Sequence, residues 1–325
     1  MNEEKKESLY ISVRGGLGYN LSLASVAVEL KQKYKKICVC SPYVDVFETC
    51  NFIDHVYHDK EFRDFIFDAK YDNAKLLCMR LYDMEGFIFK KLSYADAWRK
   101  LCDIPVKNNK NGADTISTLN PLQKFPQDQK FLDDVMNKIK NDNYENFVIM
   151  QFEGGQSPLN PVPTGMDGKP DWSQVQTDYF KEPLKRHYPF EMAAEFIKMF
   201  QKEHPKTAII MYQLPNEHTY EKTFNFEIPY LCYYDLAKKI ECVGTVSIDS
   251  SLQHLVAGVT KSVVIWGHSL PDSFGYSYNK NIIQHCNREQ IFYFTDLGPS
   301  NAKIDYIKPE ELLKEVDDYL FSKKE

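Results

Sequence analysis

The stretch LYISVRGGLGYNLSLASVAVEL, residues 9–30, decides the fold of this chain. Residues 9–13 have the alternation and composition of a strand, and residues 14–18 form a glycine-rich turn. Apolar residues then recur at positions 23, 26, 27 and 30, the spacing of a helix, before a second short strand at residues 37–40. A strand, loop, helix and strand in this order predict a parallel sheet with helices on both faces.

The same plan recurs in the second half of the chain. Strands are expected at 147–151, 207–212, 244–248 and 262–266, with helices between them, whereas the polar residues 104–145 separate the two halves. The predicted fold class is α/β with two Rossmann-like domains. The expected division is residues 1–143, residues 144–306 and a terminal helical segment, residues 307–325.

The length, composition and net charge of the chain limit the functions that it can have. The chain has 325 residues, enough for two domains, and a net charge of −6 without long runs of one sign, which argues against nucleic-acid binding as the main function. No signal peptide or membrane-spanning run is evident, and the eight cysteines show no CxxC pair. We therefore expect reduced thiols, no transmembrane segment and a cytoplasmic location.

The first candidate site is the turn after the opening strand. Its glycines, Gly16 and Gly18, let a backbone approach a ligand, and the following helix start favours negative charge. The dinucleotide fingerprint fails because Leu21 stands where a third glycine is needed, and no Gly-Lys-Ser/Thr of a phosphate loop follows. A tight turn without a ligand is the alternative.

The second candidate is a pair of cations, Lys185 and Arg186, just before a helix expected from residue 190. Arginine binds phosphate oxygens through two parallel hydrogen bonds, so the pair suits a diphosphate. A solvated basic turn is the alternative.

The third candidate is the segment SIDSSLQH, residues 247–254, where a strand ends and a helix starts. Hydroxyls and free N–H groups at such a helix start hold phosphate or ribose oxygens, which singles out Asp249, Ser250, Ser251 and His254. Alternatively, Asp249 serves only as an N-cap and His254 only as a core residue.

Taken in order, the three clusters resemble the family-9 glycosyltransferases, the ADP-heptose:lipopolysaccharide heptosyltransferases. Residues 247–276 resemble their carboxy-terminal signature, residues 15–21 their Gly-x-Leu-Gly-Asp loop, and Arg186 with Tyr188-Pro189 their basic residue before Trp-Pro. The resemblance implies two Rossmann-like domains facing across a cleft, the GT-B arrangement. It also implies a terminal helix that packs back on the first domain.

The same resemblance implies a function. A nucleotide-diphosphate sugar would be the donor, held mainly by the second domain, with Lys185, Arg186, Ser250, Ser251 and His254 around the diphosphate and Asp249 near the sugar. A saccharide or glycolipid acceptor would lie against the first domain, and peripheral membrane contact is compatible with this. Inversion at the anomeric carbon is part of the same implication. The absence of an Asp-x-Asp motif near the expected site predicts a transferase that requires no metal and no further cofactor.

The chain departs from the family at the base that activates the acceptor. The family's loop has an aspartate after its second glycine, where this chain has Tyr19 in the catalytic position. Asp83 and Glu85 are the predicted substitutes, with Glu153 behind them, although loop acids are usually only solvated. Residues 157–177, rich in Pro, Gly and Asp, are expected to be a lid or an acceptor-specific insertion.

Two other functions stay open. The tyrosine at position 19 is compatible with a nucleotide-sugar-binding module that has lost catalysis. A nucleotide-sugar epimerase on the same scaffold is the other alternative.

Overall fold

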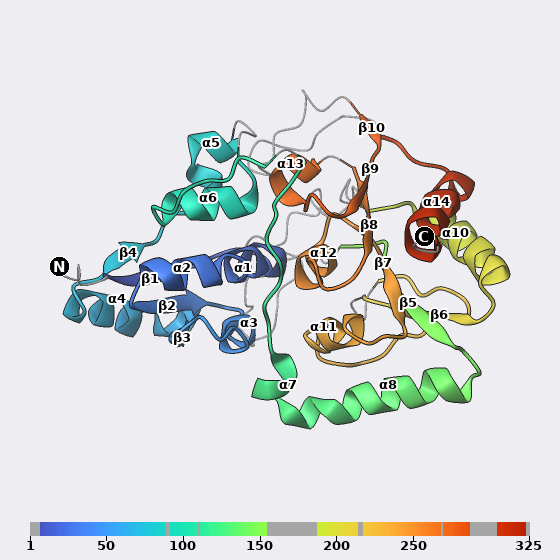
Figure 1. The fold of residues 1–325 in the computed structure, drawn as a ribbon, viewed down its shortest axis with the longest axis horizontal. Helices are drawn as coiled ribbons and strands as arrows, with labels where there is room; N and C mark the ends of the chain where they lie inside the picture. Colours follow the sequence, from blue (N-terminus) through green and yellow to red (C-terminus); the bar gives the residue numbers. More distant parts are fainter. Residues whose placement is uncertain are drawn as a thin grey trace, which may run out of the picture.

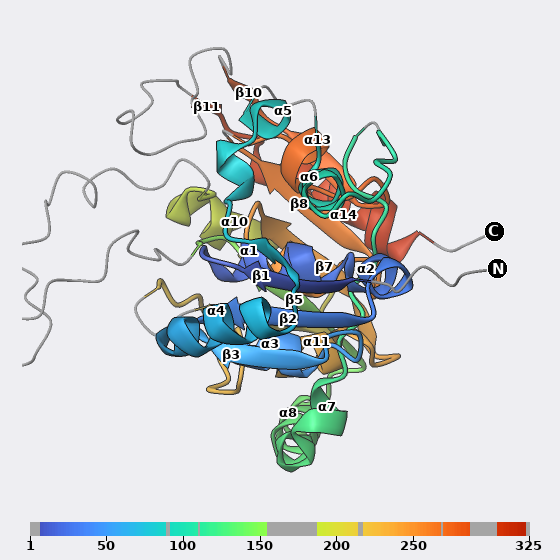
Figure 2. The ribbon, with the colours of Figure 1, turned by 90° about the vertical axis from the view of Figure 1, so that its left-hand side faces the viewer.

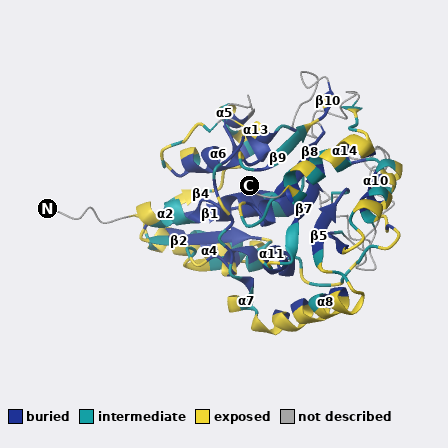
Figure 3. Cartoon of the chain, turned by 45° about the vertical axis from the view of Figure 1, so that its right-hand side comes forward, coloured by how far each residue is buried: buried dark blue, intermediate teal, exposed yellow. Residues whose placement is uncertain are grey.

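The computed structural model describes residues 7–88, 92–109, 111–154, 187–213, 217–267, 269–286 and 304–322. They form two parallel sheets with helices packed around each, which confirms the predicted α/β class (Figures 1 and 2). Buried strands lie inside and exposed helix faces outside (Figure 3). Across these ranges no helix has the length and apolar character needed to cross a membrane.

The first sheet carries the glycine-rich turn. Its strands are β1 (Ser8–Ser12), β2 (Lys36–Ser41), β3 (His55–His58) and β4 (Lys75–Leu77), in the order β3-β2-β1-β4 and all parallel. Its helical segments are α1 (Leu17–Ala24), α2 (Ala27–Lys33), α3 (Val44–Glu48), η1 (Asp59–Glu61), α4 (Phe62–Tyr71), η2 (Leu81–Asp83), α5 (Glu85–Ile88) and α6 (Tyr94–Leu101). We call this part the first unit.

The helix expected over 22–34 starts earlier and is interrupted between α1 and α2. The Ser22 and Ser25 hydroxyls donate to the carbonyl oxygens of Tyr19 and Ser22, at 2.7 and 2.8 Å. Such side-chain bonds to backbone carbonyls bend helices, which accounts for the break.

The second sheet confirms the four strands expected in the second half and adds a fifth. It comprises β5 (Asn146–Gln151), β6 (Thr207–Met211), β7 (Cys242–Ile248), β8 (Ser262–Trp266) and β9 (Lys280–Ile283), in the order β6-β5-β7-β8-β9 and all parallel. Around it lie α7 (Pro121–Lys124), η3 (Pro126–Asp128), α8 (Gln129–Asn141), α10 (Phe190–Glu203), α11 (Cys232–Ala237), α12 (Ser251–Leu255), α13 (Pro271–Phe274) and α14 (Pro309–Val316), with β10 (His285–Cys286), β11 (Ile304–Asp305) and η7 (Asp317–Phe321). We call this part the second unit.

The two units are joined by the connecting segment, residues 111–120, which runs along the second unit from the region of α6 to α7 (Figure 1). Ala113 forms a β-bridge with Tyr276, and the Ser117 N–H donates to the Ala257 carbonyl at 2.8 Å. Buried apolar side chains of both units also form one continuous cluster. The units therefore share a core along this junction.

Two boundaries differ from the sequence prediction. Helix α8 contacts α11, and Tyr144 packs edge-on against Phe224, so the second unit begins before residue 143. Helix α14 packs against α10 of the second unit, with Leu312 and Val316 in the second unit's core, instead of returning to the first (Figure 1). An amphipathic stripe does not reveal which partner covers it, so the sequence misplaced this helix.

Replacing Asp235 by asparagine is expected to stabilise the protein. Asp235 on α11 is 8% exposed, one carboxylate oxygen has no hydrogen-bond partner, and burial raises its pKa. The pKa of Asp235 is therefore higher in the folded protein than in the unfolded chain, where it is about 4. The free energy of unfolding consequently falls as the pH rises from about 4 through the folded-state pKa. Asp235→Asn should raise the free energy of unfolding by about 1 kcal/mol at pH 8 and by less at pH 5, measured by urea denaturation.

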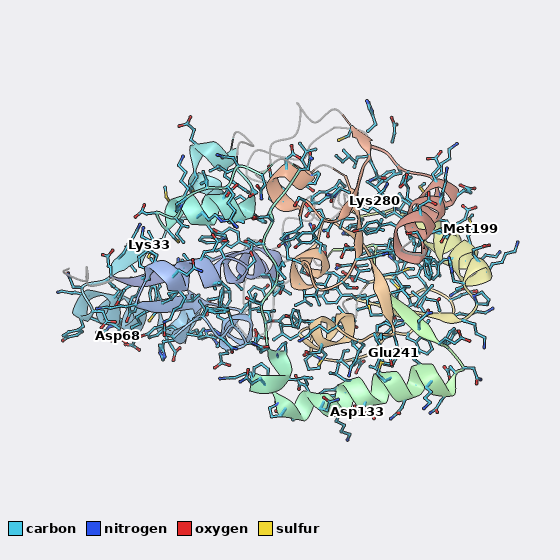
Figure 4. The ribbon with its side chains drawn as sticks, in the orientation of Figure 1. Lys33, Asp68, Asp133, Met199, Glu241 and Lys280 are labelled. Carbon is cyan, nitrogen blue, oxygen red and sulfur yellow. The ribbon has the colours of Figure 1, made fainter. Side chains whose placement is uncertain are left out.

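The matched control is Asp133→Asn on α8. Asp133 is exposed and points away from the protein (Figure 4), so its substitution should change stability by less than about 0.5 kcal/mol at either pH. Equal effects of the two substitutions would show that burial of Asp235 carries no cost.

Candidate functional site

The second sheet places a binding position at the carboxyl ends of β5 and β7. The chain leaves β5 toward β6 on one side and later enters β7 on the other, so the strand order reverses between them. In open α/β sheets ligands bind outside the strand ends at such a reversal. The residues that follow β5 and β7 are therefore the first candidates.

Two of the predicted site residues meet there. The Ser250 hydroxyl, just before α12, donates to Oε1 of Gln151, the last residue of β5. The Ser251 hydroxyl lies 3.3 Å from the Tyr212 hydroxyl, just beyond the end of β6. The sequence prediction thus placed both serines correctly at a strand-to-helix turn beside the reversal.

Asp249 braces this turn. It is 3% exposed, and its two oxygens accept hydrogen bonds from Gln253 Nε2, at 2.8 Å, and from the Ser269 hydroxyl. The Asp249 carboxylate thus connects the end of β7 to α12 and to the residues before α13. An N-cap hydrogen bond, the alternative considered for Asp249, is not formed.

A small pocket opens beside this turn, at the carboxyl ends of β5 and β6. Its lining residues are Phe152, Glu153, Met211, Tyr212, Gln213, Glu217, His218 and Tyr220. Glu153 forms an ion pair with His218, whose ring stacks on Phe190 at a centroid distance of 4.4 Å. Oε1 of Gln213 and the Tyr220 hydroxyl are buried and find no hydrogen-bond partner in the described part of the chain. Buried polar groups are nearly always paired, and the cavity volume of about 10 Å³ has room for a single water or for one polar group of a larger ligand beside them.

The sequence analysis missed most of this pocket. Of its lining residues only Glu153 was considered, and then as a base. The available signal was the presence of four polar residues, Gln213, Asn216, Glu217 and His218, just after a predicted strand, because strand ends in parallel sheets carry binding residues.

In the first unit the glycine-rich turn is held by Asn20. Asn20 is fully buried, and its Nδ2 donates to the carbonyl oxygens of Gly16, at 2.9 Å, and Gly15, at 3.2 Å. Its Oδ1 accepts from the Ser41 hydroxyl at 2.6 Å, which ties the turn to the end of β2. The sequence analysis assigned no role to Asn20, whereas its contacts fix the shape of the turn.

Gly18 and His254 meet at the junction of the units. A Cβ at Gly18 would lie 2.6 Å from Cδ2 of His254, so only glycine lets α1 approach α12 this closely. His254 is 4% exposed, and its Nδ1 lies 2.9 Å from the Tyr276 hydroxyl. Both residues thus have a packing role, and contact of His254 with a diphosphate stays a prediction.

Tyr19 does not have the geometry of a catalytic residue. It is 4% exposed, its ring packs against Tyr82 and Trp98, and its hydroxyl accepts the Leu81 N–H at 2.9 Å. Burial raises its pKa far above neutrality, so the phenol stays protonated and cannot serve as a base. The prediction that Tyr19 is catalytic is therefore corrected: Tyr19 is a core residue.

The other predicted bases have different surroundings. Asp83, in η2 beyond the end of β4, pairs with Arg80 at 3.0 Å, and that hydrogen bond lowers its pKa. Glu85 is exposed at the start of α5. Lys185, Arg186 and the segment 157–177 lie outside the described residues. Within the described ranges no three His, Cys, Asp or Glu side chains converge as ligands for a metal ion.

Comparison with solved structures supports the fold expected from the resemblance. The chain is similar to E. coli ADP-heptose lipopolysaccharide heptosyltransferase II, with a TM-score of 0.61 and 12% identity over 97% of this chain and 98% of that one. It is also similar to a family 9 glycosyltransferase of Veillonella parvula, with a TM-score of 0.59 and 12% identity over 98% of both chains. A third structure, E. coli heptosyltransferase WaaC with ADP-2-deoxy-2-fluoro heptose, has a TM-score of 0.51 and 12% identity over 96% of this chain and 99% of that one.

Comparison of the sequence, by contrast, identifies no relative. No protein-family model matches the chain, and the comparison with curated proteins gives no match. The fold is therefore heptosyltransferase-like, and the activity has to be argued from the site.

Gly18→Ala is expected to destabilise the protein. The added methyl would meet the buried His254 ring, so the free energy of unfolding should fall by about 1–3 kcal/mol, measured by chemical denaturation. Gly16→Ala is the matched control, because no atom lies within 4 Å of a Cβ there, and it should change stability far less. Similar losses in both variants would contradict the close packing of α1 on α12.

Proposed function

We propose that this protein is a glycosyltransferase that moves a sugar from a nucleotide-diphosphate donor to a hydroxyl group of a saccharide or glycolipid. The observation that carries the proposal is the polar pocket beside Ser250 and Ser251, with unpaired buried groups at Gln213 and Tyr220. It lies on the β6 side of the strand-order reversal between β5 and β7, in a fold shared with heptosyltransferases. Because such reversals bind nucleotides in open α/β sheets, we place the donor nucleoside outside these strand ends, with the polar groups of the pocket at its edge.

In this proposal the diphosphate lies next to the pocket. Ser250 and Ser251 offer hydroxyls, and Lys185 and Arg186 supply positive charge to the leaving diphosphate. His254 and Asp249 line the base of the same turn, and the loop with Gly16 and Gly18 faces the acceptor side. Cations and hydroxyl donors aimed at the departing phosphate lower the barrier to transfer, so the reaction runs without a metal and inverts the anomeric centre.

The donor is proposed to be an ADP-activated sugar. A structurally similar heptosyltransferase was solved with ADP-2-deoxy-2-fluoro heptose. We accordingly propose adenosine as the nucleoside, bound outside the strand ends next to the pocket. The acceptor binds the first unit, whose exposed acids Asp83 and Glu85 lie beyond β4.

A nucleotide-sugar-binding module without catalysis is the second candidate. The burial of Tyr19 favours it, because the first-unit loop then carries no base. Such a module would have the same donor site as the proposed transferase but would not catalyse sugar transfer.

Nucleotide binding is the first test. Thermal-shift measurements with ADP, UDP, GDP and CDP should show selective stabilisation by ADP, and a ligand at 100 times its Kd stabilises the folded state by about 2.7 kcal/mol. Tyr220→Phe and Gln213→Ala should weaken binding about fivefold to tenfold, because each removes one polar group that the nucleoside would pair with. No stabilisation by any of the four diphosphates would overturn the proposed donor site.

Turnover is the second test. Arg186→Ala should lower acceptor-dependent release of ADP from an ADP-sugar by about 10- to 100-fold in kcat/KM, since a charge-assisted bond to phosphate is lost. Lys206→Ala, at an exposed residue before β6, should leave turnover unchanged. Binding of ADP-heptose without release of ADP by the wild type would favour the binding module.

A further inference from the structure

Stacked aromatic rings lead from the pocket at the carboxyl ends of β5 and β6 to the surface. Tyr220 is buried in the pocket lining, and its ring centroid lies 5.4 Å from that of Phe190, the first residue of α10. Phe190 is exposed, and the His218 ring stacks on it at a centroid distance of 4.4 Å, with 27° between the ring planes. His218 is thus the outermost of three aromatic side chains that begin at the pocket.

One face of the His218 ring is open to a ligand. The His218 side chain is 58% exposed, and Phe190 covers one face of its ring. The exposed part therefore includes the opposite face, and within the described ranges no other ring packs against His218. Aromatic rings attract one another in stacked arrangements, so a flat aromatic ligand can lie on this outer face.

Glu153 holds the His218 ring in place. Glu153 follows β5 closely, its side chain is mostly buried, and its Oε1 accepts a hydrogen bond from Nδ1 of His218. An ionised carboxylate can only accept, so Nδ1 carries the proton. Because the ring is fixed both at Nδ1 and against Phe190, a ligand that stacks on it has little side-chain freedom left to remove.

The position of these rings suits the base of a bound nucleotide. Tyr212 lines the same pocket, and its hydroxyl lies 3.3 Å from that of Ser251, which is proposed to meet the donor diphosphate. A ligand that extends from Ser251 past the pocket to His218 needs phosphate at one end, a polar group in the middle and a flat ring at the other end. A nucleoside diphosphate has these three parts in this order, whereas a saccharide has no planar ring.

We propose that Phe190 and His218 form the stacking platform for the nucleobase of the donor, and that Glu153 is a positioning residue for the His218 ring. This inference rests on the proposed glycosyl transfer and adds the residues that meet the base. Every nucleobase has a π-face, so the platform contributes affinity without selecting among bases.

His218→Ala is the decisive variant, with the Kd for ADP measured by isothermal titration calorimetry. This Kd should rise about 10-fold because the stacking contact is lost, whereas the Kd for inorganic pyrophosphate should stay within about twofold. His218→Phe keeps a ring beside Phe190 and should bind ADP within about threefold of the wild type. His285→Ala is the matched control, because His285 is also exposed and lies 3.3 Å from a carboxylate, that of Asp305. It should leave both Kd values unchanged.

Glu153 is tested by one conservative and one truncating substitution. Glu153→Gln keeps an oxygen that can accept from Nδ1 of His218 and should leave the Kd for ADP within about twofold. Glu153→Ala frees the ring, so the Kd for ADP should rise about threefold to fivefold. An unchanged Kd in Glu153→Ala would show that Glu153 does not position the platform.

Ring-current shifts separate direct stacking from an indirect effect. A base that lies over the His218 ring moves the ¹H NMR signals of that ring upfield, and the signals are identified by their loss in His218→Ala. Addition of ADP should produce this shift, and addition of pyrophosphate should not. If the wild type binds ADP without the shift, or His218→Ala binds ADP as tightly as the wild type, the platform is overturned and the proposed function is not. Failure of the wild type to bind ADP overturns the proposed function and this inference with it.

Discussion

The close packing of α1 on α12 is the contact on which the arrangement of the site depends. Gly18 lacks the side chain that would collide with His254, and Tyr276 holds the other side of that ring. Because both helices follow directly from the carboxyl end of a strand, their contact brings the binding edges of the two parallel sheets together. The two helices that start at these edges therefore lie against each other.

A buried ion cluster supports this junction from the side of the connecting segment. The Arg99 side chain is 1% exposed and pairs with Glu29 at 2.8 Å, Asp96 at 2.9 Å and Asp114 at 3.1 Å. Hydrogen bonds from Arg99 lower the pKa of Glu29. A buried guanidinium is tolerated only when it is paired, so the cluster anchors Asp114 and the start of the connecting segment to the first unit. The segment then continues along the second unit through Ala113 and Ser117.

The glycine-rich turn of the first unit differs in its chemistry from the loop of the resembled family. The loop position that carries a base in the resembled family is occupied by Tyr19, whose burial among Tyr82 and Trp98 makes it part of the core. The Tyr19 hydroxyl also accepts the Leu81 N–H, so this turn offers no base for the proposed transfer.

The sequence by itself determined the α/β class, strands β1 and β2, four of the five strands of the second sheet and the strand-to-helix turns at Gly16 and Ser250, because each depends on local periodicity and turn chemistry. Only the tertiary structure decided that α14 covers α10, that His254 packs on Gly18, and that Gln213 and Tyr220 face one pocket. Ala113 and Tyr276 are 163 residues apart and meet only across the junction. Local patterns specify which face of an element is buried, whereas the partner of that face is fixed by packing between distant segments.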